Sequence, residues 1–181
     1  MSEINVDTIK DKTGTTAITI DTSGLTTINK LNPTIVPMWW GLKGSDQTLT
    51  RGSKTKLTSF NTGEIDTDSA FDQTTFTVPS GKGGVYMLQS HTFFDYSNVG
   101  SDGEQGYSYF YINGTERDRM GVAGQNTPDF TQPVLSHVTF VTLSAGDTVE
   151  VYAALWDANG GNSRVLGGAN FGCQFGGMKV G

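Results

Sequence analysis

The amino-acid sequence predicts an all-β protein, a sandwich or jelly roll of eight to ten strands, preceded by a short, extended β arm at the N-terminus. Short runs of β-branched and aromatic residues alternate with turn clusters along the chain. The 181 residues include 24 glycines, and only 17% are charged, a balance that favours turns and strands over helices. No window shows an apolar stripe of helical period bounded by caps, so almost no helix is expected.

Residues 1–36 are predicted to form the arm. Short β-branched runs between residues 3 and 29 are separated by turns at 11–14 and 21–24. Because an isolated hairpin is marginal in water, the apolar side of each run needs a partner surface. A floppy chain end is the alternative, although disordered tails are usually poor in Ile, Val and Thr. The candidate attachment residues are Ile4, Val6, Ile9, Ile18 and Ile20.

Residues 37–181 are predicted to form the head, after a connector stiffened by Pro33 and Pro37. Its first strand is expected over residues 38–42, with weaker strands over 47–50 and 56–59. A strand over 74–78 leads into a turn at 79–84. The long strand over 85–94 places Tyr86, Leu88 and Phe94 on one side, which indicates a half-buried strand although Phe93 breaks the alternation.

The following hairpin carries three tyrosines. On a strand over 107–113, Tyr107, Tyr109 and Tyr111 lie on one side, and Phe110 and Ile112 lie on the other. Both sides of this strand therefore need cover. The Asn-Gly pair at 113–114 is a hairpin signal that returns the chain through a strand over 115–120.

Three further strands complete the predicted head, over residues 137–143, 148–156 and 170–180, with a turn at 144–147. The strand over 148–156 alternates between an apolar side and a side that carries Glu150, Tyr152 and Trp156. The apolar side consists of Val149, Val151, Ala153 and Leu155. This alternation predicts that the apolar side faces a core.

Charge and composition argue against several classes of function. The net charge is −6, and lysines and arginines are scattered singly, so nucleic-acid binding is not expected. The chain shows no basic start followed by an apolar run and no long apolar stretch, so neither an export signal nor membrane insertion is expected. With Cys173 as the single cysteine, we expect no disulfide and no thiolate-rich zinc site, but a buried, inert thiol.

The sequence offers no clear catalytic or metal site. His91 and His137 each follow a serine on a predicted strand, and neighbours in a strand point to opposite sides. The acidic residues Asp95, Asp102 and Glu104 do not have the spacing of a calcium loop, so a solvated loop is the favoured interpretation. No pair of acids stands out for sugar hydrolysis. We therefore predict no catalytic residue, no bound metal and no cofactor.

Three segments, in this order, carry a family resemblance. TFTVPSGKGGVYMLQS at 75–90 resembles a strand, a Pro-Gly turn and a tyrosine-containing strand; VTFVTLSAGDTVEVYAAL at 138–155 resembles a hairpin with the pattern Leu-Xaa-Xaa-Gly-Asp-Xaa-Val; ANFGCQFGGMKVG at 169–181 resembles a closing strand rich in Phe and Gly. Together they resemble the heads of the C1q and tumour-necrosis-factor-like family. The likeness spans residues 38–181, with an insertion at 80–83.

The resemblance implies a jelly roll of ten strands that assembles as a homotrimer, with one face packed around the threefold axis. The tyrosine-bearing faces lie opposite the expected core, and so much exposed aromatic area would demand a partner. The candidate trimer interface is therefore Tyr107, Tyr109, Tyr111 and Tyr152.

The arm resembles N-terminal segments of phage fibres and other virion proteins, especially those of phages that infect cyanobacteria and other marine bacteria. This resemblance implies a non-enzymatic surface protein of the virion, assembled in the cytoplasm of a bacterial host. The arm would dock onto other virion proteins of the tail or the capsid, and the heads would contact host-surface glycans or reinforce the shell. A free carbohydrate-binding or adhesion module of a bacterium is the alternative, and a hydrolase is a third class. The candidate recognition residues are Trp156, Asn159, Asn162 and Arg164.

Overall fold

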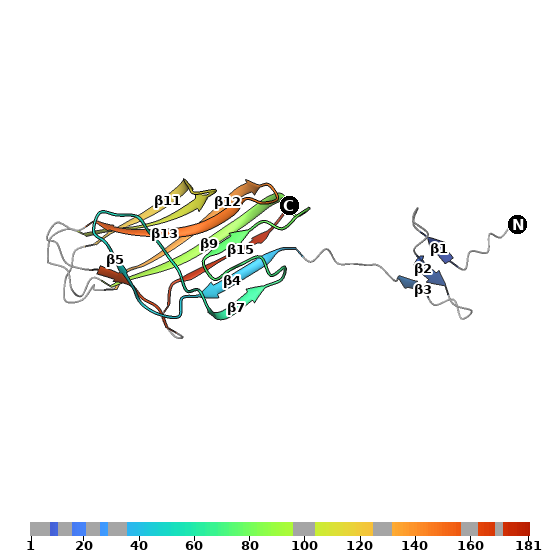
Figure 1. Cartoon of the computed structure of the whole chain (residues 1–181), viewed down its shortest axis with the longest axis horizontal. Coiled ribbons are helices and arrows are strands. Elements are labelled where there is room, and N and C mark those ends of the chain that lie inside the picture. Colours follow the sequence, from blue (N-terminus) through green and yellow to red (C-terminus); the bar gives the residue numbers. More distant parts are fainter. Residues whose placement is uncertain are drawn as a thin grey trace, which may run out of the picture. The chain divides into compact units, whose positions relative to one another are not determined.

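The computed structural model describes residues 8–10, 16–20, 26–28, 36–95, 104–124, 132–156, 163–168 and 172–181. The chain divides into two compact units, Met1–Ile35 and Val36–Gly181 (Figure 1). In the first unit, the strands β1 (Thr8–Lys10), β2 (Thr16–Ile20) and β3 (Thr26–Ile28) form an antiparallel sheet in chain order. Ile9 on β1 pairs with Ile18 on β2, and Ile20 is the last residue of β2. Ile4 and Val6 lie outside the described residues.

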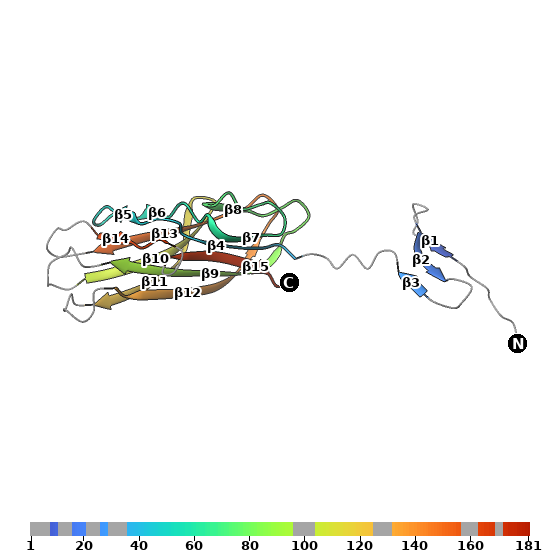
Figure 2. The same ribbon diagram turned by 90° about the horizontal axis from the view of Figure 1, so that it is seen from below.

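In the second unit, the head, the described residues form twelve strands in two antiparallel sheets, and none of them is helical. The five-stranded sheet has β11 (Thr115–Gly124), β10 (Glu104–Ile112) and β13 (Thr148–Trp156) side by side. The short strands β6 (Thr55–Lys56) and β8 (Thr75–Thr77) both pair with the free edge of β13. Figure 1 and Figure 2 show that the long strands of both sheets lie roughly along one common axis.

The seven-stranded sheet is built around β9 (Gly84–Asp95). One edge of β9 pairs with β12 (Val134–Leu143), and the other edge pairs with β15 (Gln174–Lys179) and then with β14 (Ser163–Val165). Beyond them lie β4 (Met38–Leu42), β7 (Thr62–Asp66) and β5 (Gln47–Leu49). The prediction of an all-β sandwich is confirmed.

Several predicted strands and turns are also confirmed. β4 has the predicted bounds, and Asn113 and Gly114 both have positive φ angles, 51° and 72°, as a type I′ hairpin turn requires. Two strands were not predicted, β7 and β14. β7 contains a glycine and two acids, and β14 has only three residues, so neither shows a clear apolar alternation.

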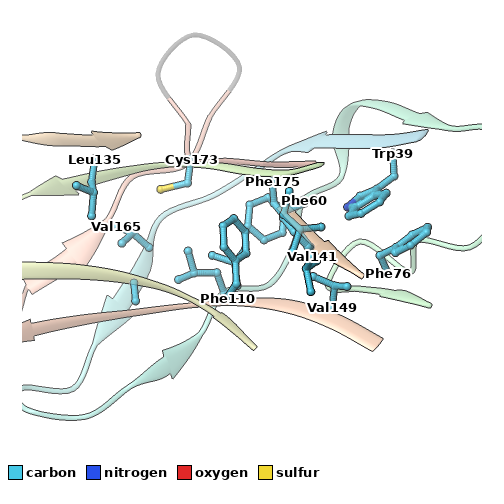
Figure 3. Close-up of a cluster of buried hydrophobic side chains, with 14 of the residues drawn as sticks. Trp39, Phe60, Phe76, Phe110, Leu135, Val141, Val149, Val165, Cys173 and Phe175 are labelled. Atoms are coloured by element: carbon cyan, nitrogen blue, oxygen red, sulfur yellow. The ribbon is translucent and has the colours of Figure 1, made fainter. Parts of the chain in front are cut away.

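The core lies between the two sheets and is rich in aromatic rings. Trp39 stacks on Phe76 with ring centres 3.6 Å apart, and Phe175 packs edge-on against Trp39, Phe60 and Phe71. Figure 3 shows Trp39 and Phe76 at one end of this cluster and Cys173 with Leu135 at the other. Alternate residues of β13 enter the core as predicted, since Val149, Val151, Ala153 and Leu155 are all buried.

The inner side of β9 explains the broken alternation in its sequence. Tyr86, Leu88 and Phe94 are buried, and so are Ser90 and Thr92 between them, while Phe93 is half-buried. The hydroxyl of Ser90 lies 3.1 Å from the hydroxyl of Ser108 on β10, so the two small polar residues satisfy each other across the sandwich. β9 is therefore half-buried, as predicted.

A buried histidine, His137, predicts that the stability of the head depends on pH. The side chain of His137 on β12 is 2% exposed, its ring packs 4.4 Å from that of Phe110, and its Nε2 lies 3.6 Å from Asp118 Oδ2. Burial lowers the pKa of His137, although Asp118 acts in the opposite direction. Its Nδ1 is buried without a hydrogen-bond partner among the described residues, which also favours the neutral ring.

We expect the free energy of unfolding to decrease as the pH falls from about 6.5 toward the lowered pKa of His137. In that window the unfolded chain binds a proton that the folded chain does not. Urea unfolding at pH 7.5 and 5.5 measures the effect, and His137→Phe should remove this part of the pH dependence. His91→Asn, at the half-buried histidine, is the matched control and should keep it. An unchanged pH dependence in His137→Phe would contradict this assignment.

Candidate functional site

The outer face of the seven-stranded sheet is apolar. On the edge strand β12, Phe140 is 62% exposed and Val138 is 49% exposed. Cross-strand partners point to the same side, and the register places Phe140 beside Met87, then Met178, then Met38 on successive strands. We call this surface the apolar face, and its most exposed side chains are Met38, Ile65, Val85, Val134, Val138 and Phe140.

A groove of about 250 Å³ crosses the apolar face. Gly176 forms part of its floor, because a side chain there would meet the backbone oxygen of Trp39 at 2.7 Å and the Trp40 ring at 3.1 Å. The glycine therefore lets the Trp40 ring lie close to the sheet. The groove is lined mainly by Met38, Trp40, Ile65, Met87, Gln89 and Met178.

A Ser–His contact lies on the same side of this sheet, between residues far apart in sequence. Ser136 Oγ is 2.9 Å from His91 Nδ1, and Gln89 Nε2 is 2.7 Å from His91 Nε2. With the Gln89 amide donating to Nε2, the ring proton sits on Nδ1 and is donated to the serine hydroxyl. A histidine in this form does not remove the serine proton.

The four predicted interface tyrosines lie on the outer face of the five-stranded sheet, which we call the tyrosine face. Tyr109 pairs with Tyr152 across β10 and β13, and the rings of Tyr111 and Tyr152 stack at 4.0 Å. Tyr109 is only 2% exposed, and Tyr107, Tyr111 and Tyr152 are half-buried. The tyrosines project away from the core as expected, but neighbours in the same chain cover much of their area. Their role in assembly stays a prediction.

Charged side chains frame the tyrosine face. Lys54 pairs with Glu116, and its ammonium group lies 4.9 Å from the centre of the Tyr109 ring. Lys56 pairs with Glu150. Burial raises the pKa of Tyr109 and of Tyr152, so both phenols stay protonated at neutral pH and serve as hydrogen-bond donors.

The predicted recognition residues fall on different parts of the head. Trp156 ends β13 on the five-stranded sheet and is 49% exposed. Arg164 lies on β14 of the other sheet, where its Nε is 2.7 Å from the buried carboxylate of Asp95 and its Nη1 is 2.9 Å from Asp46. These two ion pairs neutralise the guanidinium and tie β14 to its neighbours. Asn159 and Asn162 lie outside the described residues.

Two buried polar groups lie where β4 ends and β15 begins. Cys173 is fully buried, and burial raises the pKa of its thiol to about 11, which confirms the expected inert cysteine. Lys43 is also buried, which its sequence context did not indicate, and burial lowers its pKa. Its ammonium donates to Gln47 Oε1 at 2.8 Å and to the backbone oxygen of Thr58.

None of the described residues form a group of three or more His, Cys, Asp or Glu side chains that could hold a metal ion. The described part of the chain contains no helix long and apolar enough to cross a membrane. Asp102 lies outside the described residues.

Comparison with known proteins identifies the fold. No protein-family model and no curated protein sequence matches the chain. Among solved structures, the globular domain of the zebrafish complement 1qA protein is similar, with a TM-score of 0.54 and 15% sequence identity over 80% of this chain and 98% of that one. At this identity the likeness shows the fold alone. The head is therefore an all-β jelly roll of the C1q globular type.

Proposed function

We propose that the chain is a non-enzymatic surface protein of a bacteriophage particle, a homotrimer that docks by its N-terminal arm and displays C1q-like heads. The apolar face carries the assembly part of this proposal. Phe140, Val138 and Val134 lie exposed along one edge strand, and a groove continues their apolar surface across the sheet. Monomers rarely leave such a surface open to water.

Further copies of the same chain are the proposed cover for this face. Among the described strands, β12 pairs only with β9, and packing in a closed trimer would protect its other edge as well as its side chains. The family resemblance of the head also implies a trimer. The apolar face is a better-supported interface than the tyrosine face, because the tyrosine rings are already partly covered within the protomer.

The arm supports the virion part of the proposal. Its sequence resembles N-terminal segments of phage fibres, and it forms a compact unit separate from the head. Its three strands contain only three to five residues each, and a sheet of this size is marginal without a partner surface. We assign that surface to another virion protein, of the tail or of the capsid. The protein would then assemble with the particle in the host cytoplasm and act in host adhesion or shell stabilisation.

Two measurements test the two parts of the proposal. Light scattering of the purified chain at micromolar concentration should give three times the chain mass of 19.4 kDa. Gold-labelled antibody on purified phage particles should decorate a regular position, which would also distinguish tail from capsid. A stable monomer would contradict the trimer. Absence from the particles would contradict the virion role and favour a free bacterial adhesion module.

A further inference from the structure

The tyrosine face contains a hollow of about 340 Å³ whose lining combines aromatic rings with cations. Its lining side chains come from β10, β11, β13 and the residue preceding β6. Its volume lies within the range of about 300–1,000 Å³ that is usual for small-molecule sites. We call this site the aromatic hollow, and its lining is Lys54, Gln105, Tyr107, Tyr109, Arg119 and Trp156.

The aromatic rings of the hollow are held in place before any ligand arrives. Tyr109 is 2% exposed, with the Lys54 ammonium above its ring. Trp156 rests on Gly52, where an added Cβ would lie 3.5 Å from the indole, and the Gly52 N–H donates to the Leu155 oxygen at 3.0 Å. Gly52 has a φ of +67°, a conformation that suits glycine. Trp156 is therefore positioned by the backbone and yet remains 49% exposed.

Tyr107 is fixed in a similar way. Its ring lies directly against Gly121 on β11, where an added Cβ would come within 2.6 Å of Tyr107 Cε1. Its hydroxyl donates to Gln105 Oε1 at 2.6 Å. Rigid aromatic and amide groups lose little conformational entropy on binding, so the site is preorganised.

The charges of the hollow indicate the sign of its ligand. Lys54 is paired with Glu116, whereas no described carboxylate forms an ion pair with the guanidinium of Arg119. The lining therefore has a net positive charge on a chain whose total charge is −6. A cationic ligand would be repelled by Lys54 and Arg119, although aromatic groups alone would attract it. A single uncompensated cation is also too little for a nucleic-acid backbone.

We infer that the aromatic hollow binds a saccharide unit that carries a carboxylate or a sulfate group. The C–H face of a sugar ring would pack on the exposed indole of Trp156, its hydroxyls would bond Gln105 and Tyr107, and its acidic group would pair with Arg119. The inference rests on the proposed adhesion role for its biological use, and it names the class of ligand. It places ligand recognition on the outer face of the five-stranded sheet. Arg164 is not part of this site, and its charge is already neutralised by Asp95 and Asp46.

Calorimetric titration of the full chain with acidic oligosaccharides tests the inference. The probes are oligogalacturonate and a sulfated carrageenan oligosaccharide, each compared with its neutral form, methyl-esterified or desulfated. The acidic forms should bind more tightly than the neutral forms, and added salt should lower the affinity of the acidic forms. Trp156→Ala and Arg119→Gln should each lower the affinity about tenfold or more. Trp156→Phe should retain most of it.

Arg117→Gln is the matched control, because Arg117 is an exposed arginine on the same strand that the lining of the hollow does not include. It should leave binding unchanged. Equal binding of the acidic and neutral forms, or equal losses for Arg119→Gln and Arg117→Gln, would overturn the inference. Light scattering of the same samples separates it from the proposed function. A wild-type trimer that binds neither acidic probe would contradict ligand binding in the aromatic hollow but not the proposed trimer. A monomer that binds the probes would contradict the trimer but not ligand binding.

Discussion

Replacing Phe140 with aspartate is expected to convert the proposed trimer into monomers. Phe140 is 62% exposed in the protomer and is the most exposed apolar side chain on β12, so the substitution removes little from the core of the head. At a subunit interface, the same change would bury an unpaired charge. The free energy of association should become less favourable by about 2 kcal/mol or more at each contact, as for a buried interface residue. Every copy in the trimer carries the same change.

The measurement is light scattering of Phe140→Asp beside wild type at equal micromolar concentration, with urea unfolding to verify that the head stays folded. Tyr111→Ser is the comparison on the tyrosine face, where Tyr111 stacks on Tyr152. It should remain trimeric. A trimeric Phe140→Asp with a monomeric Tyr111→Ser would move the interface to the tyrosine face. Tyr109→Asp is a less suitable test of the tyrosine face, because an aspartate at this 2% exposed position would destabilise the protomer itself.

The sequence predicts the fold well where strands alternate strictly and turns have a specific chemistry. On β13 the inner positions are all apolar, and Tyr152 and Trp156 fall on the outer side as expected. The turn at Asn113 and Gly114 follows from the two residues that tolerate positive φ angles most readily. The alternation of apolar residues and the type of turn are local properties, so both can be recognised in a single sequence.

The apolar face could not be predicted in the same way. On β12 the buried positions include Leu135 and Val141, while Val138 and Phe140 face outward. Both sides of this strand are apolar, and the period alone does not state which side meets the core. Only the packing of the two sheets, which leaves Val138 49% and Phe140 62% exposed, shows which side of β12 remains uncovered in the protomer.

The aromatic hollow depends on pairings between distant segments. Arg119 lies beside Tyr109 through the register of β11 and β10, and Gln105 lies opposite Trp156 through the register of β10 and β13. The contact between His91 and Ser136 arises in the same way, from β9 and β12. A sequence places a residue on one side of its strand, but the partner strand and its register are fixed by the whole sandwich.

Deleting residues 1–35 is expected to abolish incorporation of the protein into phage particles while leaving the head folded and trimeric. The head is a compact unit by itself, and its buried cluster begins at Trp39. The cut leaves Val36, whose backbone oxygen accepts a hydrogen bond from the Thr67 hydroxyl at 3.3 Å. Removing the arm therefore takes away no residue of the core, and the free energy of unfolding of the head should stay nearly unchanged.

The test is an immunoblot of purified particles from cells that make either the full chain or the truncated chain, with light scattering of both purified proteins. Ile18→Asp in the full chain should also reduce incorporation, because Ile18 pairs with Ile9 at the middle of the small sheet and is a predicted attachment residue. Thr19→Asp, one residue along β2, adds the same charge and is its matched control. A truncated head that still enters particles would place the attachment on the head. Aggregation of the truncated chain would mean that the arm contributes to the folding of the head.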